Sequence, residues 1–312
     1  MKILVFGAGV LGSYYATKLH QAGMDVTILA RGEKYQNIKE QGIVLEDYFS
    51  HEKIIVPIKV IEKPEPNGYD LVMIFVQMIQ VESVIPILAE IKSAKSFLFL
   101  GNNVIGFDKA CRTLGKERVL AGFGAVGGKR DGHTVLFVDA DPKKPDKKGP
   151  IIIGELNGII GGRIQEIKKT LEIAKLKVNI SKDIDGWLKT HAAIILGMAG
   201  AVYKVDLNTK KLVEDKNLIY LIIRSMKEAI KVLESLKITI EPSKYKNMKL
   251  YPNFLLYRIF KKFLGSEFAA IGLVGHAQAA RSEMKALSEG FLKLAEQSSI
   301  RIDTLKKILG YI

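Results

Sequence analysis

The chain has 312 residues, 48% of them hydrophobic, so it can bury a substantial core, and its length suggests about two domains. Its single cysteine, Cys111, excludes an intrachain disulfide scaffold and suits a reducing compartment, so we expect a cytoplasmic protein. The net charge of +14 favours anionic ligands, but the lysine-rich stretch 143–148 is broken by Pro145 and is expected to be a solvated loop without nucleic acid. No apolar run approaches the roughly 18 residues of a membrane span.

The N-terminal part of the chain alternates short β-branched runs with helical patterns, which is typical of a parallel sheet covered by helices. A helix is expected over residues 11–22. The expected strands are residues 2–6, 25–29, 71–76, 97–100, 119–122, 134–138, 151–154 and 177–180. We expect 134–138 and 151–154 to be antiparallel additions at the sheet edge, with 177–180 closing the domain.

Beyond residue 181 the pattern becomes helical, with almost no strand signal. A loop is expected over 241–252, because this segment contains two prolines and several lysines. The expected helices are residues 184–198, 217–236, 254–263, 267–298 and a short one after Asp303. Residues 1–181 and 182–312 are therefore predicted to be separate domains.

A glycine-rich turn follows the first strand directly and opens the first helix. It reads Gly7-Ala8-Gly9-Val10-Leu11-Gly12, which matches G-x-G-x-x-G in the context that indicates dinucleotide binding. Gly7 permits the tight turn, Gly9 lets the backbone approach a pyrophosphate, and Gly12 allows close packing of helix on strand. The six residues 7–12 are predicted to bind the cofactor. The fold class is thus an α/β N-terminal Rossmann domain plus an all-α C-terminal domain.

The second strand runs into Arg31 instead of ending in the acidic residue that accepts the ribose 2′-hydroxyl of NAD. A guanidinium can bind a 2′-phosphate with two hydrogen bonds, whereas a carboxylate would repel it. Arg31 therefore favours NADP(H) as the cofactor, although Glu33 lies close enough in sequence to reach a hydroxyl instead.

Over nearly its whole length the chain resembles the ketopantoate reductase family. The resemblance rests on the glycine motif, on Arg31, on Asn102 after a strand, and on the segments 131–132, 183–189 and 282–284. It implies reduction of 2-dehydropantoate (ketopantoate) to pantoate by NADPH, a step of pantothenate biosynthesis.

The resemblance also implies the catalytic residues. Lys189 is expected to polarise the keto oxygen and to act as general acid. Asn102 is expected to bind the cofactor ribose or the substrate, with Asn103 as the alternative. Glu283 would accept a hydrogen bond from a substrate hydroxyl or pair with Lys189, although the alignment needs a slip of one residue there.

Three positions depart from the family pattern. Gln77, counted here among the cofactor-binding residues, stands where the family has a lysine, and Ala193 and Gly197 replace two asparagines. A substrate other than ketopantoate is therefore plausible, because a site loses discrimination when its hydrogen-bonding groups are absent. His191 is interpreted as a core or interdomain histidine, and His276 is a weaker catalytic candidate still. No metal site is predicted.

Three functions are compatible with this pattern. The first is a ketopantoate reductase-like enzyme acting on a small 2-oxo acid. The alternatives are another NADP-dependent hydroxyacid or polyol-phosphate dehydrogenase, and an NADP(H)-binding sensor without catalysis. Residues 254–271 mix aromatic and aliphatic side chains with Lys261 and Lys262 and are expected in the helical core, with a homodimer contact or a membrane surface as the alternatives.

Overall fold

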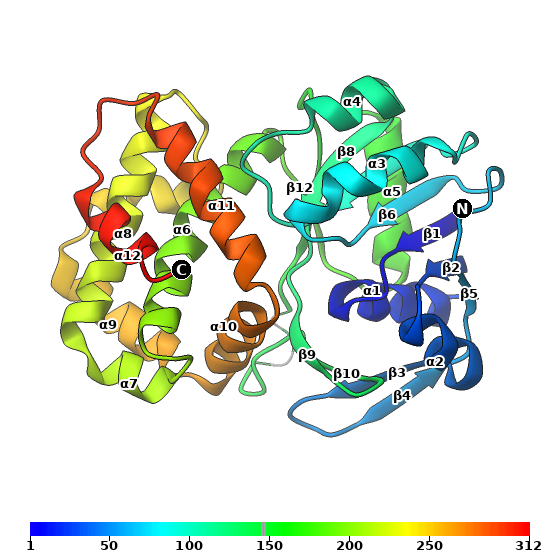
Figure 1. The fold of residues 1–312 in the computed structure, drawn as a ribbon, viewed down its shortest axis with the longest axis horizontal. Coiled ribbons are helices and arrows are strands. Elements are labelled where there is room, and N and C mark those ends of the chain that lie inside the picture. Colours follow the sequence, from blue (N-terminus) through cyan, green and yellow to red (C-terminus); the bar gives the residue numbers. More distant parts are fainter. Residues whose placement is uncertain (145, 147) are drawn as a thin grey trace. The chain divides into compact units, whose positions relative to one another are not determined.

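The computed structural model describes residues 1–144, 146 and 148–312, and the side chain of His276 lies outside the described part. The chain folds into two compact units. Unit 1 comprises residues 1–101 and 107–184, and unit 2 comprises residues 102–106 and 185–312. Figure 1 shows an α/β unit and a helical unit, which confirms the predicted fold class.

Unit 1 is built around an eight-stranded sheet. Six neighbouring strands are parallel, and their order reverses between β1 and β6, as in a Rossmann fold. β6 and β7 are buried along their whole length, as expected for parallel strands covered on both faces. The strands in spatial order are β5 (Lys59–Ile61), β2 (Asp25–Leu29), β1 (Lys2–Phe6), β6 (Leu71–Ile74), β7 (Ser96–Leu100), β8 (Val119–Phe123), β11 (Ile151–Glu155) and β12 (Val178–Ile180).

Most predicted strands of this sheet are confirmed to within two residues. β11 pairs antiparallel with β8, as predicted, but it does not form the edge because β12 pairs parallel with it on the other side. The helices of unit 1 are α1 (Val10–Gln21), α2 (Glu33–Gln41), α3 (Val81–Ala89), α4 (Asp108–Leu114) and α5 (Gly162–Ile173), with 3-10 turns η1 (Met78–Gln80) and η2 (Lys116–Arg118).

A second sheet of four strands corrects the prediction for residues 134–138. This segment forms β10 (Thr134–Val138), but it pairs with β3 (Ile43–Asp47) and β9 (Gly127–Asp131) and does not join the main sheet. β4 (Lys53–Val56) completes the sheet beside β3. Val135 and Phe137 of β10 belong to the same buried core cluster as the strands of the main sheet, so the two sheets share one core.

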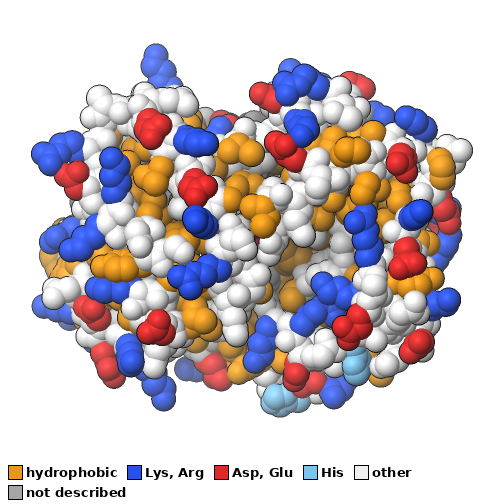
Figure 2. All heavy atoms as spheres, in the orientation of Figure 1, with side chains coloured by type: hydrophobic (Ala, Val, Ile, Leu, Met, Phe, Trp, Pro, Cys, Tyr) orange, Lys and Arg blue, Asp and Glu red, His pale blue; other side chains and the backbone are white. Residues whose placement is uncertain are grey.

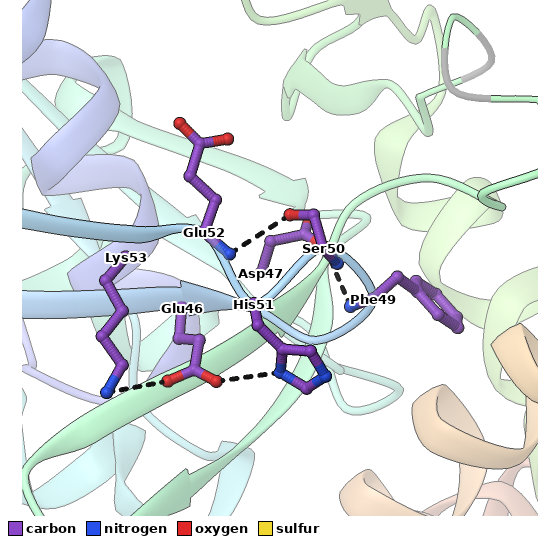
Figure 3. A network of polar contacts seen from close by, with 7 residues as sticks. All are labelled: Glu46, Asp47, Phe49, Ser50, His51, Glu52 and Lys53. Atoms are coloured by element: carbon purple, nitrogen blue, oxygen red, sulfur yellow. Dashed lines mark hydrogen bonds and ion pairs between the residues drawn. The ribbon is translucent and has the colours of Figure 1, made fainter.

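The turn between β3 and β4 is closed by a local polar network (Figure 3). Asp47 Oδ1 accepts hydrogen bonds of 2.9 Å from the backbone N–H groups of Phe49 and Ser50. Glu46 forms a hydrogen bond with His51 Nδ1 at 3.1 Å and an ion pair with Lys53 at 3.4 Å, and the bond from His51 lowers the pKa of this carboxyl. The polar side chains of this hairpin therefore have their partners within the hairpin, and they need no ligand to explain them.

Unit 2 is helical. Two expectations for it were wrong: 267–298 is not one helix but two, and 241–252 contains 3-10 turns in place of a loop. The helices are α6 (Ile184–Lys204), α7 (Thr209–Glu214), α8 (Lys216–Ser235), the 3-10 segment η3 (Ser243–Leu250), α9 (Asn253–Leu264), α10 (Glu267–Ala279), α11 (Arg281–Ala295) and α12 (Asp303–Leu309).

The break between α10 and α11 has a long-range cause. In an unbroken helix the carbonyl of Ala277 would accept the N–H of Arg281. Instead it accepts the hydroxyl of Tyr203 at 2.7 Å, while the Arg281 guanidinium stacks 4.9 Å from the Tyr203 ring centroid. A tyrosine from α6 therefore takes the place of a backbone bond and stabilises the interruption.

None of the helices in the described part is long and apolar enough to cross a membrane. The apolar stretch 192–202 lies inside α6. On the face drawn in Figure 2, the lysine and arginine side chains are scattered among acidic ones and do not form one basic patch.

Candidate active site

The glycine turn after β1 has the close packing that its motif requires. Gly7 adopts a φ of +110°, and a Cβ there would lie 2.5 Å from the carbonyl oxygen of Phe75 at the end of β6. A Cβ on Gly12 would lie 1.9 Å from the carbonyl oxygen of Gly7. Gly9 differs, because a Cβ there would meet nothing within 4 Å. Close packing therefore explains why residues 7 and 12 are glycines. It does not explain the glycine at position 9.

The turn opens α1 without a side-chain cap. Gly9 is the N-cap residue, and no side chain hydrogen-bonds to the first free N–H groups of the helix. Val10 and Leu11 occupy the first turn and are partly buried. N–H groups without a side-chain cap and the positive end of the helix dipole are the features with which helix N-termini bind anions in general.

Arg31 follows β2 after the buried Ala30, and its side chain is exposed. Gly32, with a φ of +57°, turns the chain into α2 directly behind it. Arg31 forms no ion pair within the described part of the chain, so its guanidinium is available to a ligand.

Gln77 follows β6. The strand order reverses between β1 and β6, so Gln77 and Arg31, which follows β2, lie on opposite sides of the reversal. Its side chain accepts a hydrogen bond from the backbone of Gln80, while Gln80 Oε1 accepts the Gln77 N–H at 3.1 Å. The two residues form a capping box for η1. The side-chain oxygen of Gln77 thus has a local structural partner. A lysine ammonium at this position could not accept that hydrogen bond.

Lys189 lies near the start of α6, and 15% of its side chain is exposed. Its ammonium donates a short hydrogen bond to Asp185 Oδ2, one helical turn earlier. The Asp185 side chain is 45% exposed, so the pair is not sealed from solvent. Asp185 was not among the predicted site residues, although its spacing of four residues from Lys189 is the ordinary signal of a helical ion pair.

The two neighbouring asparagines after β7 have different surroundings. The Asn103 side chain forms hydrogen bonds within its own loop. Its Oδ1 accepts hydrogen bonds from the backbone N–H groups of Ile105 and Gly106 at 2.9 and 2.8 Å, and its Nδ2 donates to the Gly106 carbonyl at 3.0 Å. Asn102 is 7% exposed, and its Oδ1 is buried without a hydrogen-bond partner in the described structure. A buried unpaired amide oxygen in a native fold calls for a ligand or water as its partner.

Glu283 lies in the first turn of α11 and is 4% exposed, so it is not the solvated carboxylate that a surface helix would present. Seven residues later, Gly290 packs against the loop of Asn102, because a Cβ there would lie 2.7 Å from Val104 Cγ2. Positions seven apart share a helix face. Glu283 and the loop at 102–106 therefore belong to the same side of α11.

The positions where the family has asparagines are packed inside the helical unit. Ala193 is fully buried, and a Cβ on Gly197 would lie 2.7 Å from Ser225 Oγ of α8. Ser225 is itself fully buried and donates to the Ile222 carbonyl at 2.8 Å. An asparagine at 197 would collide with α8, so the small residue is a consequence of close helix packing.

His191 stacks on Trp187 with ring centroids 5.2 Å apart and an interplanar angle of 8°. This stack places the histidine beside the only tryptophan of the chain. The side chain of His276, the weaker candidate, lies outside the described residues. Throughout the part of the chain that the structure describes, no three His, Cys, Asp or Glu side chains gather as metal ligands would.

A Rossmann sheet with this glycine turn, joined in one chain to a helical unit, defines a nicotinamide-dinucleotide-dependent oxidoreductase acting on CH–OH groups. The family model described as ketopantoate reductase PanE/ApbA matches residues 3–157. The chain is also 26% identical over 246 residues to the 2-dehydropantoate 2-reductase of Aquifex aeolicus, covering 76% of this chain and 74% of that one. The chain belongs to the ketopantoate reductase family.

Two solved structures share the fold. The 2-dehydropantoate 2-reductase of Geobacter metallireducens superposes with a TM-score of 0.79 at 19% identity, covering 100% of this chain and 98% of that one. D-mandelate dehydrogenase, solved with NADH and anilino(oxo)acetate, superposes with a TM-score of 0.78 at 17% identity, over 100% and 96%. At these identities the likeness concerns the fold alone.

Proposed function

We propose that the chain uses NADPH to reduce a small 2-oxo acid, ketopantoate to pantoate or a related compound, with Lys189 as the general acid. The observation that carries the proposal is the ion pair of Lys189 with Asp185 in the first turns of α6. In this proposal residues 1–181 bind the dinucleotide, and residues 182–312 bind the substrate and provide the surface for a homodimer.

The residues of unit 1 fit a dinucleotide. Gly9 leaves open space where a side chain would stand, and the uncapped start of α1 offers N–H groups to a pyrophosphate. Arg31, exposed and without an ion-pair partner in the described chain, supplies positive charge for a 2′-phosphate. The proposed cofactor-binding residues are Gly7, Ala8, Gly9, Val10, Leu11, Gly12, Arg31, Gln77 and Asn102.

The bound nicotinamide supplies the hydride that forms the new C–H bond at the carbonyl carbon. As the C=O double bond opens, negative charge develops on the oxygen, and the product alcohol needs one proton there. The Lys189 ammonium stabilises this charge and transfers its proton to the oxygen. Asp185 acts as a positioning residue, because its carboxylate fixes the direction of the lysine side chain.

Asn102 and Glu283 complete the proposed site. The buried Oδ1 of Asn102 lacks a partner in the described structure and suits a hydroxyl donor from the cofactor ribose or the substrate. Glu283, buried on the α11 face that packs against the Asn102 loop, suits a substrate hydroxyl. Both residues would bind and orient the ligands, and neither would take part in the proton transfer.

A second candidate function is the reduction of a 2-oxo acid with a more apolar side chain. Ala193 and Gly197 favour it, because each stands where the family has an asparagine and neither side chain offers a hydrogen bond. A site without these polar groups discriminates poorly in favour of a substrate hydroxyl.

A substrate panel tests the proposal. Purified protein is assayed for NADPH oxidation with ketopantoate, with its analogue lacking the hydroxyl, and with an aromatic 2-oxo acid, each repeated with NADH. A preference for ketopantoate supports the first function, and a preference for the other acids supports the second. Tight binding of NADPH without turnover of any acid would contradict both and indicate a sensor.

A further inference from the structure

One strand of the second sheet passes directly over the glycine turn. A Cβ on Gly128 of β9 would lie 2.2 Å from the Leu136 carbonyl oxygen and 2.9 Å from Val10 Cγ1. The absence of a side chain at 128 therefore lets β9 approach the first residue of α1. Two residues later the same strand presents Arg130, which pairs in register with Val135 of β10.

Arg130 contacts the turn itself. Its Nη2 donates to the Ala8 carbonyl at 2.5 Å and lies 3.4 Å from Ser13 Oγ, and Nη1 lies 3.4 Å from the His133 carbonyl. Its Nε is buried and has no hydrogen-bond partner in the described structure. Ala8 and Ser13 are both buried, so the guanidinium is bound to the backbone and first helical turn of the nucleotide motif.

A second cation is close enough to this guanidinium for the two charges to repel each other. Burial lowers the pKa of Arg130. Burial, followed by the nearby charge of Arg130, lowers the pKa of Lys34 at the start of α2. Within the described residues neither side chain, nor that of Arg31, forms an ion pair with a carboxylate. Like charges that repel each other are unfavourable unless an anion binds near them.

We propose that Arg130, together with Lys34 and Arg31, binds the 2′-phosphate of the dinucleotide and selects NADP(H) over NAD(H). The ligand class rests on the proposed function. Arg31 and Lys34 both follow the end of β2, where a Rossmann fold binds the ribose 2′-substituent, whereas backbone N–H groups at the start of α1 would bind the pyrophosphate. A phosphate monoester carries close to two negative charges, which suits several cations and no carboxylate.

The binding experiment uses ligands that separate the two phosphate positions. Isothermal titration compares NADPH with NADH, and adenosine 2′,5′-bisphosphate with ADP, for wild type and Arg130→Gln. The exposed neighbour Lys129 provides the matched control, as Lys129→Gln removes the same charge from the same strand. We expect Arg130→Gln to weaken NADPH and the bisphosphate by about tenfold or more, and NADH and ADP by less than about threefold. Lys129→Gln should change all four by less than about threefold.

Lys34→Gln is a second variant that should not disturb folding, because Lys34 is exposed and its side chain forms no hydrogen bond or ion pair within the described residues. It should reproduce the selective loss of NADPH and bisphosphate affinity with an unchanged melting temperature. Equal losses of NADPH and NADH affinity in Arg130→Gln, or no loss in either variant, would overturn the proposal. Wild-type protein that binds NADH as tightly as NADPH would also overturn it but leave a dinucleotide reductase standing. Wild-type protein that binds neither dinucleotide would refute the proposed function itself.

Discussion

Replacing Gly9 and Gly12 separately with alanine distinguishes ligand binding from packing at the nucleotide turn. At Gly12 the new Cβ would lie 1.9 Å from the Gly7 carbonyl oxygen, whereas real Cβ contacts stay beyond 3.0 Å, so the turn and helix must move apart by about 1 Å. Overpacking of this kind costs about 1–3 kcal/mol. It should lower the melting temperature by about 2–10 °C and also weaken dinucleotide binding.

Gly9→Ala should behave differently. Its backbone, at φ −80° and ψ −167°, is open to any residue, and a Cβ meets nothing within 4 Å. The loss of a favourable N-cap residue and the lower entropy of the unfolded chain nearly cancel, so the free energy of unfolding should change by less than about 1 kcal/mol. NADPH affinity should nevertheless fall by about tenfold or more, because the methyl group would occupy the path of the pyrophosphate.

Thermal unfolding without ligand and isothermal titration with NADPH measure the two effects on the same samples. Gly23→Ala is an unsuitable control because its φ is +77°, but Gly161→Ala is matched: Gly161 is an extended N-cap, that of α5, and a Cβ there also meets nothing within 4 Å. An unchanged NADPH affinity in Gly9→Ala would refute the argument that this glycine exists for the ligand.

Four further substitutions test individual roles. Arg31→Ala should weaken NADPH binding by about tenfold or more and leave NADH binding nearly unchanged in titrations, whereas equal losses would show that the residue is structural. Asp185→Asn should lower kcat by about tenfold in steady-state assays without changing the NADPH dissociation constant, and an unchanged kcat would remove Asp185 from the mechanism. Asn103→Ala should lower the melting temperature because three loop hydrogen bonds are lost, whereas Asn102→Ala should reduce turnover with little effect on melting; the reverse pattern would exchange their roles.

The strand–turn–helix at the N-terminus could be predicted because its signals are contiguous. Residues 2–6 and 25–29 are apolar runs with a glycine motif between them, and β1 and β2 have those bounds. β9 could not be found in this way, since its residues Gly-Gly-Lys-Arg-Asp have low strand propensity and are extended only through pairing with β10. The second sheet thus depends on contacts that no local pattern encodes.

The same distinction applies to the helices and to the candidate site. The segment joining α10 and α11 is rich in alanine, so its propensity predicts a continuous helix, and the break depends on Tyr203, 74 residues from its partner Ala277. In the site, the glycine turn is a local motif, but the bond from Arg130 to Ala8 joins residues 122 apart. Nothing near Arg130 in the sequence indicates that contact.

Single-turnover reduction tests the central claim most directly. Protein saturated with NADPH is mixed with an excess of the best 2-oxo acid of the panel, and the absorbance of the reduced nicotinamide is followed for wild type, Lys189→Ala and the exposed control Lys182→Ala. We predict rapid oxidation by wild type and the control, and a rate at least about a hundredfold lower for Lys189→Ala with NADPH still bound. Equal rates in all three proteins would contradict the assignment of Lys189 as the general acid.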